Sequence, residues 1–225
     1  MPISQHDPMP DLLTFIEQWA GPPQPGYGLD EAAIPASLPK ALRSLYRAAG
    51  RWPSLDGSDA AGQGCGLFGA QDALFPPERL QIGNGKITFL MENQGNWVCQ
   101  AEEGNDISPV YSNAAGLWQD GITEPEIVHP SLPHFLVTYC LQELVLGSPY
   151  AGTWSGDLKA PSLSGFLQPV WINGSYVFKE TSHSFYLCGD GLLLMDYFGD
   201  IWYGAVHEAA LTRIAAAGEI QPIKP

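Results

Sequence analysis

The sequence has few cysteines and few basic residues, and both shortages limit what the protein can do. Its 225 residues include four cysteines that stand singly, without a CxxC pair. Neither a zinc-ligand spacing nor the disulfide framework of a secreted domain is therefore indicated. Ten Lys and Arg against 24 Asp and Glu give a formal charge of -14. This charge repels a phosphate backbone, so nucleic acid is not an expected partner.

Long apolar segments are also absent. The longest, from Phe135 to Leu146, is about half the length of a membrane span and is interrupted by Gln142 and Glu143. The first residues contain no basic stretch ahead of an apolar run, so no secretory signal is expected. We expect a cytoplasmic protein that does not bind membranes. Its length suffices to bury a core without disulfides, metal or cofactor.

One continuous run, residues 87 to 111, predicts a β-hairpin, an acidic loop and a third short strand. Apolar and polar residues alternate with the period of two that is typical of strands from Ile87 to Met91 and from Trp97 to Cys99. The intervening residues 92 to 96 include Gly95, which can adopt a positive φ without steric cost. A tight turn is expected there.

The rest of the chain mixes helical and strand patterns. Helical spacing of apolar residues predicts helices over 11–20, about 38–49, from Ser131 to about 145, and over 206–217. Residues 147–166 are rich in Gly, Pro and Ser. From residue 169 onward, apolar runs read as strands joined by Asn-Gly, Gly-Asp-Gly and Gly-Asp turns. Residues 90–96 resemble 194–200, which indicates either a similar strand-turn-strand unit in each half or two unrelated hairpins with the same turn requirements.

Charge is distributed unevenly. Between Lys86 and Lys159 there is no Lys or Arg, whereas nine acids occur there: Glu92, Glu102, Glu103, Asp106, Asp120, Glu124, Glu126, Glu143 and Asp157. This segment could be a surface for a basic partner, or the acids could serve solubility alone. The basic residues Lys40, Arg43 and Arg47 lie on the polar face of a predicted helix, which favours a solvated face.

Catalytic and metal-binding motifs are incomplete. Residues 64–69 spell GxGxxG, but no strand precedes them and no long helix follows. His207-Glu208 lacks the second histidine of a zinc-protease helix, because Leu211 stands four positions on. Two turn acids near tryptophans, Glu92 and Asp196, could act as the paired carboxylates of a glycosidase, although turn acids commonly bind only local backbone amides.

Four segments together resemble the SUKH superfamily, which includes bacterial immunity proteins of polymorphic toxin systems and a fungal regulator of cell-wall synthesis. They are LPKALRSLYRAAG (38–50), ITFLMENQGNWVCQ (87–100), PVY (109–111) and SLPHFLVTYCLQELV (131–145). The resemblance covers about residues 30–147. It implies one α+β domain, with helices packed on a central, mostly antiparallel or mixed sheet, followed by a strand-rich extension over about 167–217.

The resemblance also implies no catalytic activity and a protein partner, a cognate toxin that is often a nuclease. An acidic inhibitor can associate rapidly with a basic nuclease cleft by electrostatic steering. Charge and loop position then select the expected contacts, with Trp118 as an aromatic anchor: Glu102, Glu103, Asp106, Trp118, Asp120, Glu124 and Glu126. The alternatives are a regulatory scaffold related to cell-wall synthesis and a carbohydrate-acting hydrolase.

Overall fold

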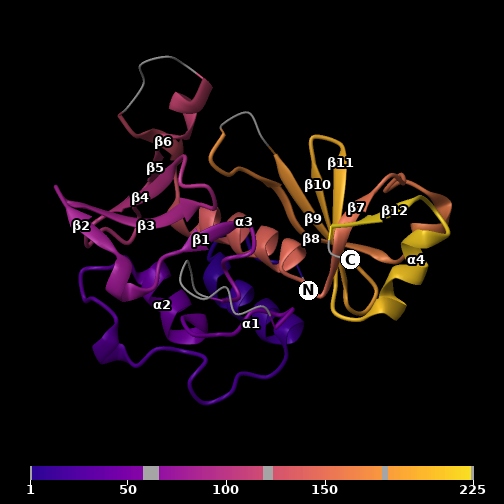
Figure 1. Ribbon diagram of the computed structural model, residues 1–225, viewed down its shortest axis with the longest axis horizontal. Coiled ribbons are helices and arrows are strands. Elements are labelled where there is room, and N and C mark those ends of the chain that lie inside the picture. The colour runs from indigo at the N-terminus through magenta and orange to yellow at the C-terminus, as the bar shows by residue number, and fades with distance from the viewer. Residues whose placement is uncertain (1, 58–65, 119–123, 179–181, 224–225) are drawn as a thin grey trace.

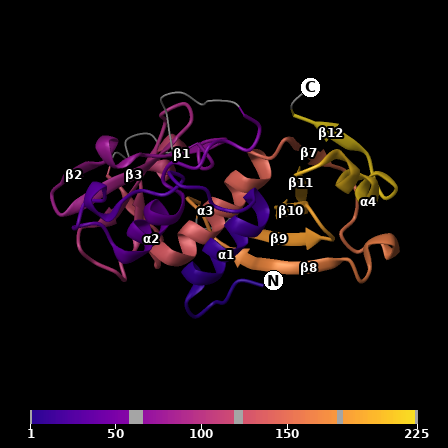
Figure 2. The ribbon, with the colours of Figure 1, turned by 90° about the horizontal axis from the view of Figure 1, so that it is seen from below.

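The fold is α+β, as the sequence predicts. The computed structural model describes residues 2–57, 66–118, 124–178 and 182–223, which form α-helices packed on two antiparallel sheets (Figures 1 and 2). The α-helices are α1 (Pro8–Ala20), α2 (Lys40–Ala49), α3 (Leu132–Leu146) and α4 (Thr212–Ala215). The short 3-10 helices are η1 (Glu31–Ala33), η2 (Pro77–Arg79), η3 (Ala114–Trp118), η4 (Pro161–Leu163) and η5 (Glu208–Leu211). In the part of the chain that the structure describes, no helix is long and apolar enough to cross a membrane.

The first sheet belongs to the N-terminal half of the chain. Its strands are β1 (Asp72–Leu74), β2 (Gln81–Gly83), β3 (Lys86–Glu92), β4 (Val98–Glu102), β5 (Val110–Ser112) and β6 (Glu126–His129). Their order is β1-β3-β4-β5-β6, and β2 also pairs with β3. The hairpin, acidic loop and third strand predicted over 87–111 are therefore confirmed. Gly95 adopts a φ of 77° in the β3–β4 turn, which explains why glycine stands there.

The second sheet belongs to the C-terminal half. Its strands are β7 (Tyr150–Trp154), β8 (Leu167–Gly174), β9 (His183–Cys188), β10 (Leu192–Tyr197), β11 (Asp200–Ala205) and β12 (Ile220–Pro222), in the order β12-β7-β11-β10-β9-β8. Hairpin β10–β11 spans the segment that resembles residues 90–96. Each sheet thus contains one of the two similar strand-turn-strand units. Strand β7 lies where the sequence shows only an abundance of Gly, Pro and Ser.

Helix α3 lies between the two sheets (Figure 1) and is buried on every side. It contacts α1 and α2 as well as β7, β8, β10 and β11. A helix that is apolar all round is stable only where every face is covered, which explains its run of Leu, Val, Phe and Tyr. Figure 2 shows α1 and α2 beside α3, with the N-terminal segment next to β8, where Ile3 N donates to Val170 O at 3.0 Å.

Both faces of β10, in the second sheet, are buried over residues 192–195. Leu193 and Met195 of β10 belong to the core that contains α1, α2 and α3, whereas Leu192 and Leu194 belong to a smaller core with Ile214 of α4. Successive strand residues point to opposite faces, so the continuous apolar run of β10 meets a packed layer on each side.

Three details of the sequence prediction need correction. Helix α1 begins at Pro8 rather than Asp11, because proline is well tolerated in the first turn. Asn173-Gly174 ends β8 and does not form a tight turn; a Cβ on Gly174 would lie 2.4 Å from Thr138 Oγ1, so this glycine permits the close approach of α3. The final helix predicted over 206–217 is divided into η5 and the four-residue α4.

Candidate functional site

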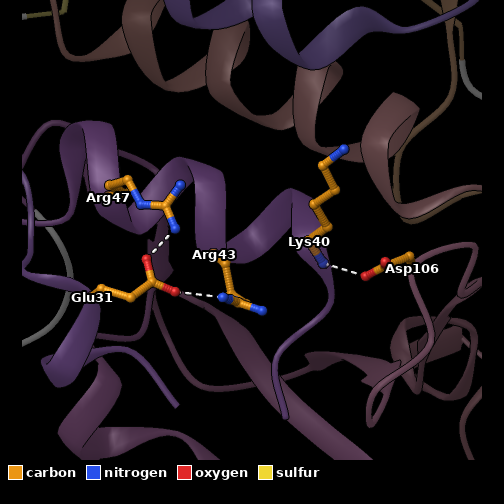
Figure 3. Close-up of polar contacts among 5 residues, drawn as sticks. All are labelled: Glu31, Lys40, Arg43, Arg47 and Asp106. Carbon is orange, nitrogen blue, oxygen red and sulfur yellow. Dashed lines mark hydrogen bonds and ion pairs between the residues drawn. The ribbon is translucent and has the colours of Figure 1, made fainter. Parts of the chain in front are cut away.

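The acidic loop is attached to the start of α2. Asp106 accepts a hydrogen bond from Lys40 N at 2.6 Å, while the Lys40 side chain points away from it (Figure 3). In the same loop, Gly104 N donates to Ser37 O at 2.7 Å. The first backbone N–H groups of a helix have no partner within the helix, and a carboxylate satisfies one of them favourably. Asp106 therefore acts as a capping group across a long sequence separation.

Glu102 is bound within its own sheet. Its carboxylate accepts hydrogen bonds from Tyr111 Oη and Asn105 Nδ2, both at 2.6 Å. The Tyr111 hydrogen bond is the main reason why the pKa of Glu102 is lowered. Lys86 Nζ lies 3.5 Å from the centre of the Tyr111 ring, so a basic group adjoins this carboxylate. Glu103, by contrast, is exposed, and its backbone N donates to Gly85 O at 2.8 Å.

Two of the remaining predicted contacts, Glu124 and Glu126, lie at the other end of the sheet. Glu126 is the first residue of β6, Glu124 precedes it by two positions, and both are exposed. Ser112 of β5 pairs with Cys99 on one side and with Glu126 on the other. Glu126 is therefore about 10 Å from Glu102 along the strand direction, since strands rise about 3.3 Å per residue. Trp118 ends η3 but its side chain lies outside the described residues, as does Asp120.

The basic face of α2 is partly neutralised. Glu31 forms ion pairs with both Arg43 and Arg47, and the three side chains lie together in Figure 3. Hydrogen bonds from the two guanidinium groups lower the pKa of Glu31. Lys40 and Arg47 are exposed on the polar face of α2, as the sequence predicts. Glu31 neutralises part of the positive charge of that face.

A cavity of about 830 Å³ lies beside α3, with walls from both sheets. Sequence reasoning did not find it. Acids and aromatic side chains supply the features that matter for binding: Asp72, Glu92, Trp97, Tyr176, His183 and Trp202. Asp72 and Glu92 are direct partners in the β1–β3 pairing. Side chains at such positions share one face of the sheet, so the two carboxylates lie next to each other.

Asp72 is the most deeply buried acid of the cavity wall. Its Oδ2 accepts hydrogen bonds from Tyr176 Oη at 2.7 Å and from Gln142 Nε2 at 3.4 Å. Its Oδ1 has no hydrogen-bond partner among the described residues. The pKa of Asp72 is raised to about 6, mainly by burial and secondarily by the nearby charge of Glu92, while the hydrogen bonds from Tyr176 and Gln142 act in the opposite direction.

Glu143 of α3 supports the strand that carries Asp72. Its carboxylate accepts hydrogen bonds from Ala70 N, Gln71 N and Asp72 N at 2.7, 2.9 and 3.1 Å. The side chain is fully buried. Burial, and secondarily the charge of Asp72, raises the pKa of Glu143 to about 8, although the three backbone donors act in the opposite direction. Glu143 therefore holds its proton at neutral pH and fixes the start of β1.

The acids proposed for a hydrolase are separated by the fold. Glu92 Oε2 accepts hydrogen bonds from Gln94 N and Asn96 N, and Asp196 Oδ1 accepts one from Gly199 N, so both act as turn residues. Asp196 lies on the face of β10 opposite to the cavity-lining Met195 and Tyr197. The carboxylate beside Glu92 is Asp72, which sequence reasoning did not select.

Two of the histidines serve local structure, whereas a third belongs to the cavity wall. His183 lines the cavity, and burial lowers its pKa to about 4, so its ring is neutral at pH 7. His207 Nδ1 accepts a hydrogen bond from Ala210 N at the start of η5. Ser131 lies at the first position before α3, but its hydroxyl contacts His134 Nδ1. Among the described residues, no group of three or more His, Cys, Asp or Glu side chains is placed to hold a metal ion.

Comparison with known proteins found no relative of this chain. No family model matches the chain, and neither a curated protein nor a solved structure is significantly similar to it. The SUKH resemblance therefore stays a prediction.

Proposed function

We propose that this chain is a non-enzymatic, intracellular binding protein of the SUKH type, an immunity protein that neutralises a basic toxin domain, such as a nuclease. The observation that carries the proposal is the excess of exposed acidic groups. Glu103 and Glu124 are exposed and form no ion pair with described residues. The chain as a whole has a formal charge of -14.

The physical argument concerns the rate of association. A nuclease presents a basic cleft to its substrate, and an acidic protein is drawn to that cleft by long-range attraction before any contact forms. The attraction is screened within about 8 Å at physiological salt, so the association rate falls as salt rises. Exposed acids at both ends of the first sheet can contribute to this long-range attraction without forming one continuous patch.

The predicted contact residues fall into two groups, acids held by structural hydrogen bonds and acids that are exposed. Asp106 holds the acidic loop on α2, and Glu102 is bound to Tyr111 and Asn105. We assign direct partner contact to the exposed Glu103, Glu124 and Glu126. Trp118 and Asp120 stay predicted contacts.

Growth rescue and association kinetics test the proposal. The chain is co-expressed with a toxin domain encoded beside it, and the association rate of the purified pair is followed by stopped-flow fluorescence at several salt concentrations. We expect rescue in cells and a rate that falls with salt. The triple variant Glu103→Lys, Glu124→Lys and Glu126→Lys should associate at least about tenfold more slowly, since steering of this kind changes rates by tenfold or more.

The control carries the same substitution elsewhere. Glu17 is exposed on α1, and Glu17→Lys changes the net charge without altering the proposed contacts. It should leave rescue unchanged and reduce the rate much less than the triple variant. Absence of a neighbouring toxin, or a triple variant that rescues and associates like the wild type, overturns the proposal.

A further inference from the structure

The cavity wall formed by β1 and β3 carries two acids side by side. Asp72 and Glu92 face each other across the β1–β3 pairing, and both line the cavity. Like charges placed directly opposite each other on a sheet destabilise it. No Lys or Arg is among the described residues that line the cavity. The protein itself therefore supplies no positive charge to compensate the pair.

The cavity wall also contains polar atoms without partners. Asp72 and His183 are each 3 % exposed, and neither Asp72 Oδ1 nor His183 Nδ1 has a hydrogen-bond partner in the described part of the chain. Leaving such a buried polar group unpaired is unfavourable. Glu92 places its three hydrogen bonds on Oε2. A ligand that donates hydrogen bonds would meet unused acceptor capacity on both acids.

Aromatic side chains complete the surroundings. Trp97 and Tyr176 stand edge to face with ring centres 6.1 Å apart, and Tyr197 and Trp202 line the cavity from the second sheet. The face of an aromatic ring attracts a cation, most strongly when the site is shielded from water. The same rings can also cover the apolar stem of a ligand.

We propose that this cavity binds an organic cation, a guanidinium or primary ammonium group, through Asp72 and Glu92, with its stem between the aromatic side chains. The volume of about 830 Å³ is in the range of sites for small molecules or one inserted side chain. The cation comes either from an arginine or lysine side chain of a protein or from a free amine. The inference does not depend on the proposed immunity function.

Calorimetric titration of the full chain with matched probes tests the inference. The probes are N-acetyl-arginine amide, N-acetyl-citrulline amide, which has nearly the same shape but no charge, and agmatine as a free amine. We expect both cations to bind in the millimolar range or better and citrulline to bind at least tenfold more weakly. Tighter binding of capped arginine assigns the site to a protein side chain, and tighter binding of agmatine assigns it to a free amine.

Two variants locate the binding. Asp72→Asn and Glu92→Gln keep the shape and the acceptor atoms that their neighbours use, and each should weaken binding about tenfold, because each removes a negative charge that attracts the cation and strengthens its hydrogen bonds. Glu17→Gln, which removes one charge from α1, should bind like the wild type. Equal binding of citrulline and arginine, unchanged affinity in both variants, or no binding of either cation overturns the inference. If Asp72→Asn does not fold, the wild-type comparison and Glu92→Gln decide.

Discussion

The carboxylate of Asp106 accepts a hydrogen bond from the backbone nitrogen of Lys40 at 2.6 Å, across 66 positions of the sequence (Figure 3). Pro39, which stands before α2, offers no side-chain cap to the first turn. The acid that sequence reasoning assigned to partner binding thus supplies the cap that α2 lacks. The same contact ties the β4–β5 loop to the helix.

Loss of this cap should measurably destabilise the protein. Asp106→Ala removes the acceptor, and we expect the free energy of unfolding to fall by about 1 kcal/mol, as for other helix N-caps. Asp106→Asn retains an acceptor oxygen and should cost less. Urea unfolding measures both. Glu103→Ala, an exposed neighbour, serves as the control, and an Asp106→Ala variant as stable as that control would contradict the capping role.

The buried Glu143 should make stability depend on pH. Its folded-state pKa of about 8 lies above its ordinary value of 4.5, so the folded protein retains a proton that the unfolded chain releases. The stabilising effect is complete below pH 4.5 and is lost as pH rises through 8. Over this interval the free energy of unfolding should fall by up to about 1.4 kcal/mol per pH unit from this group.

Glu143→Gln isolates this effect. The amide cannot ionise but replaces one acceptor oxygen by an NH₂ group, so the variant should be less stable than the wild type at pH 4.5 by about 1–3 kcal/mol. Because the wild type alone loses stability to ionisation at this position, by up to about 1.4 kcal/mol per pH unit, the difference should shrink and then reverse as pH rises to 8. Denaturant unfolding across that range measures it, with Glu17→Gln as the control. A difference that stays constant with pH would refute the assignment.

Local pattern predicted much of the first sheet. Residues 87–111 show strand alternation and a turn that needs Gly95, and these are properties of neighbouring residues. The helices around Leu12, Leu42 and Leu136 were predicted for the same reason, since apolar residues recur there at intervals of three and four positions. The lengths of the C-terminal helices were not, because a short alanine-rich segment carries little such pattern.

The cavity could not be predicted from local pattern. Tyr176 and Asp72 are 104 positions apart, and Gln142 is 70 positions from Asp72. The local periodicity of the sequence carries no information about contacts between residues so far apart. An available signal is Glu143, an acidic residue inside a mostly apolar helix, because a buried ionisable group needs partners. Following that residue to its backbone partners leads directly to β1 and to Asp72.

The junction between α3 and the second sheet depends on Gly204. A Cβ at this position would lie 2.4 Å from Val145 O and 2.7 Å from Val145 Cα, both backbone atoms of α3. Gly204→Ala should therefore force α3 and β11 apart and reduce the free energy of unfolding by about 1–3 kcal/mol, the usual cost of overpacking. Thermal unfolding measures the change. Gly83→Ala is the matched control, because Gly83 is an exposed strand glycine and a Cβ added there would meet nothing within 4 Å. Equal stability of the two variants would show that the junction can relax.

The hydrogen bond from Tyr176 to Asp72 should contribute most when Asp72 is charged. It opposes the effect of burial on the pKa of Asp72, so Tyr176→Phe should raise that pKa above about 6. Removing the hydroxyl should cost about 1.5–3 kcal/mol at pH 8, where the carboxylate is ionised, because hydrogen bonds to charged groups are the stronger ones. The cost should be smaller at pH 4.5, where Asp72 is protonated in the folded protein. Urea unfolding at the two pH values measures the difference, and Tyr150→Phe, an exposed tyrosine of β7, controls for loss of a hydroxyl. The same cost at both pH values would mean that Tyr176 acts by packing alone.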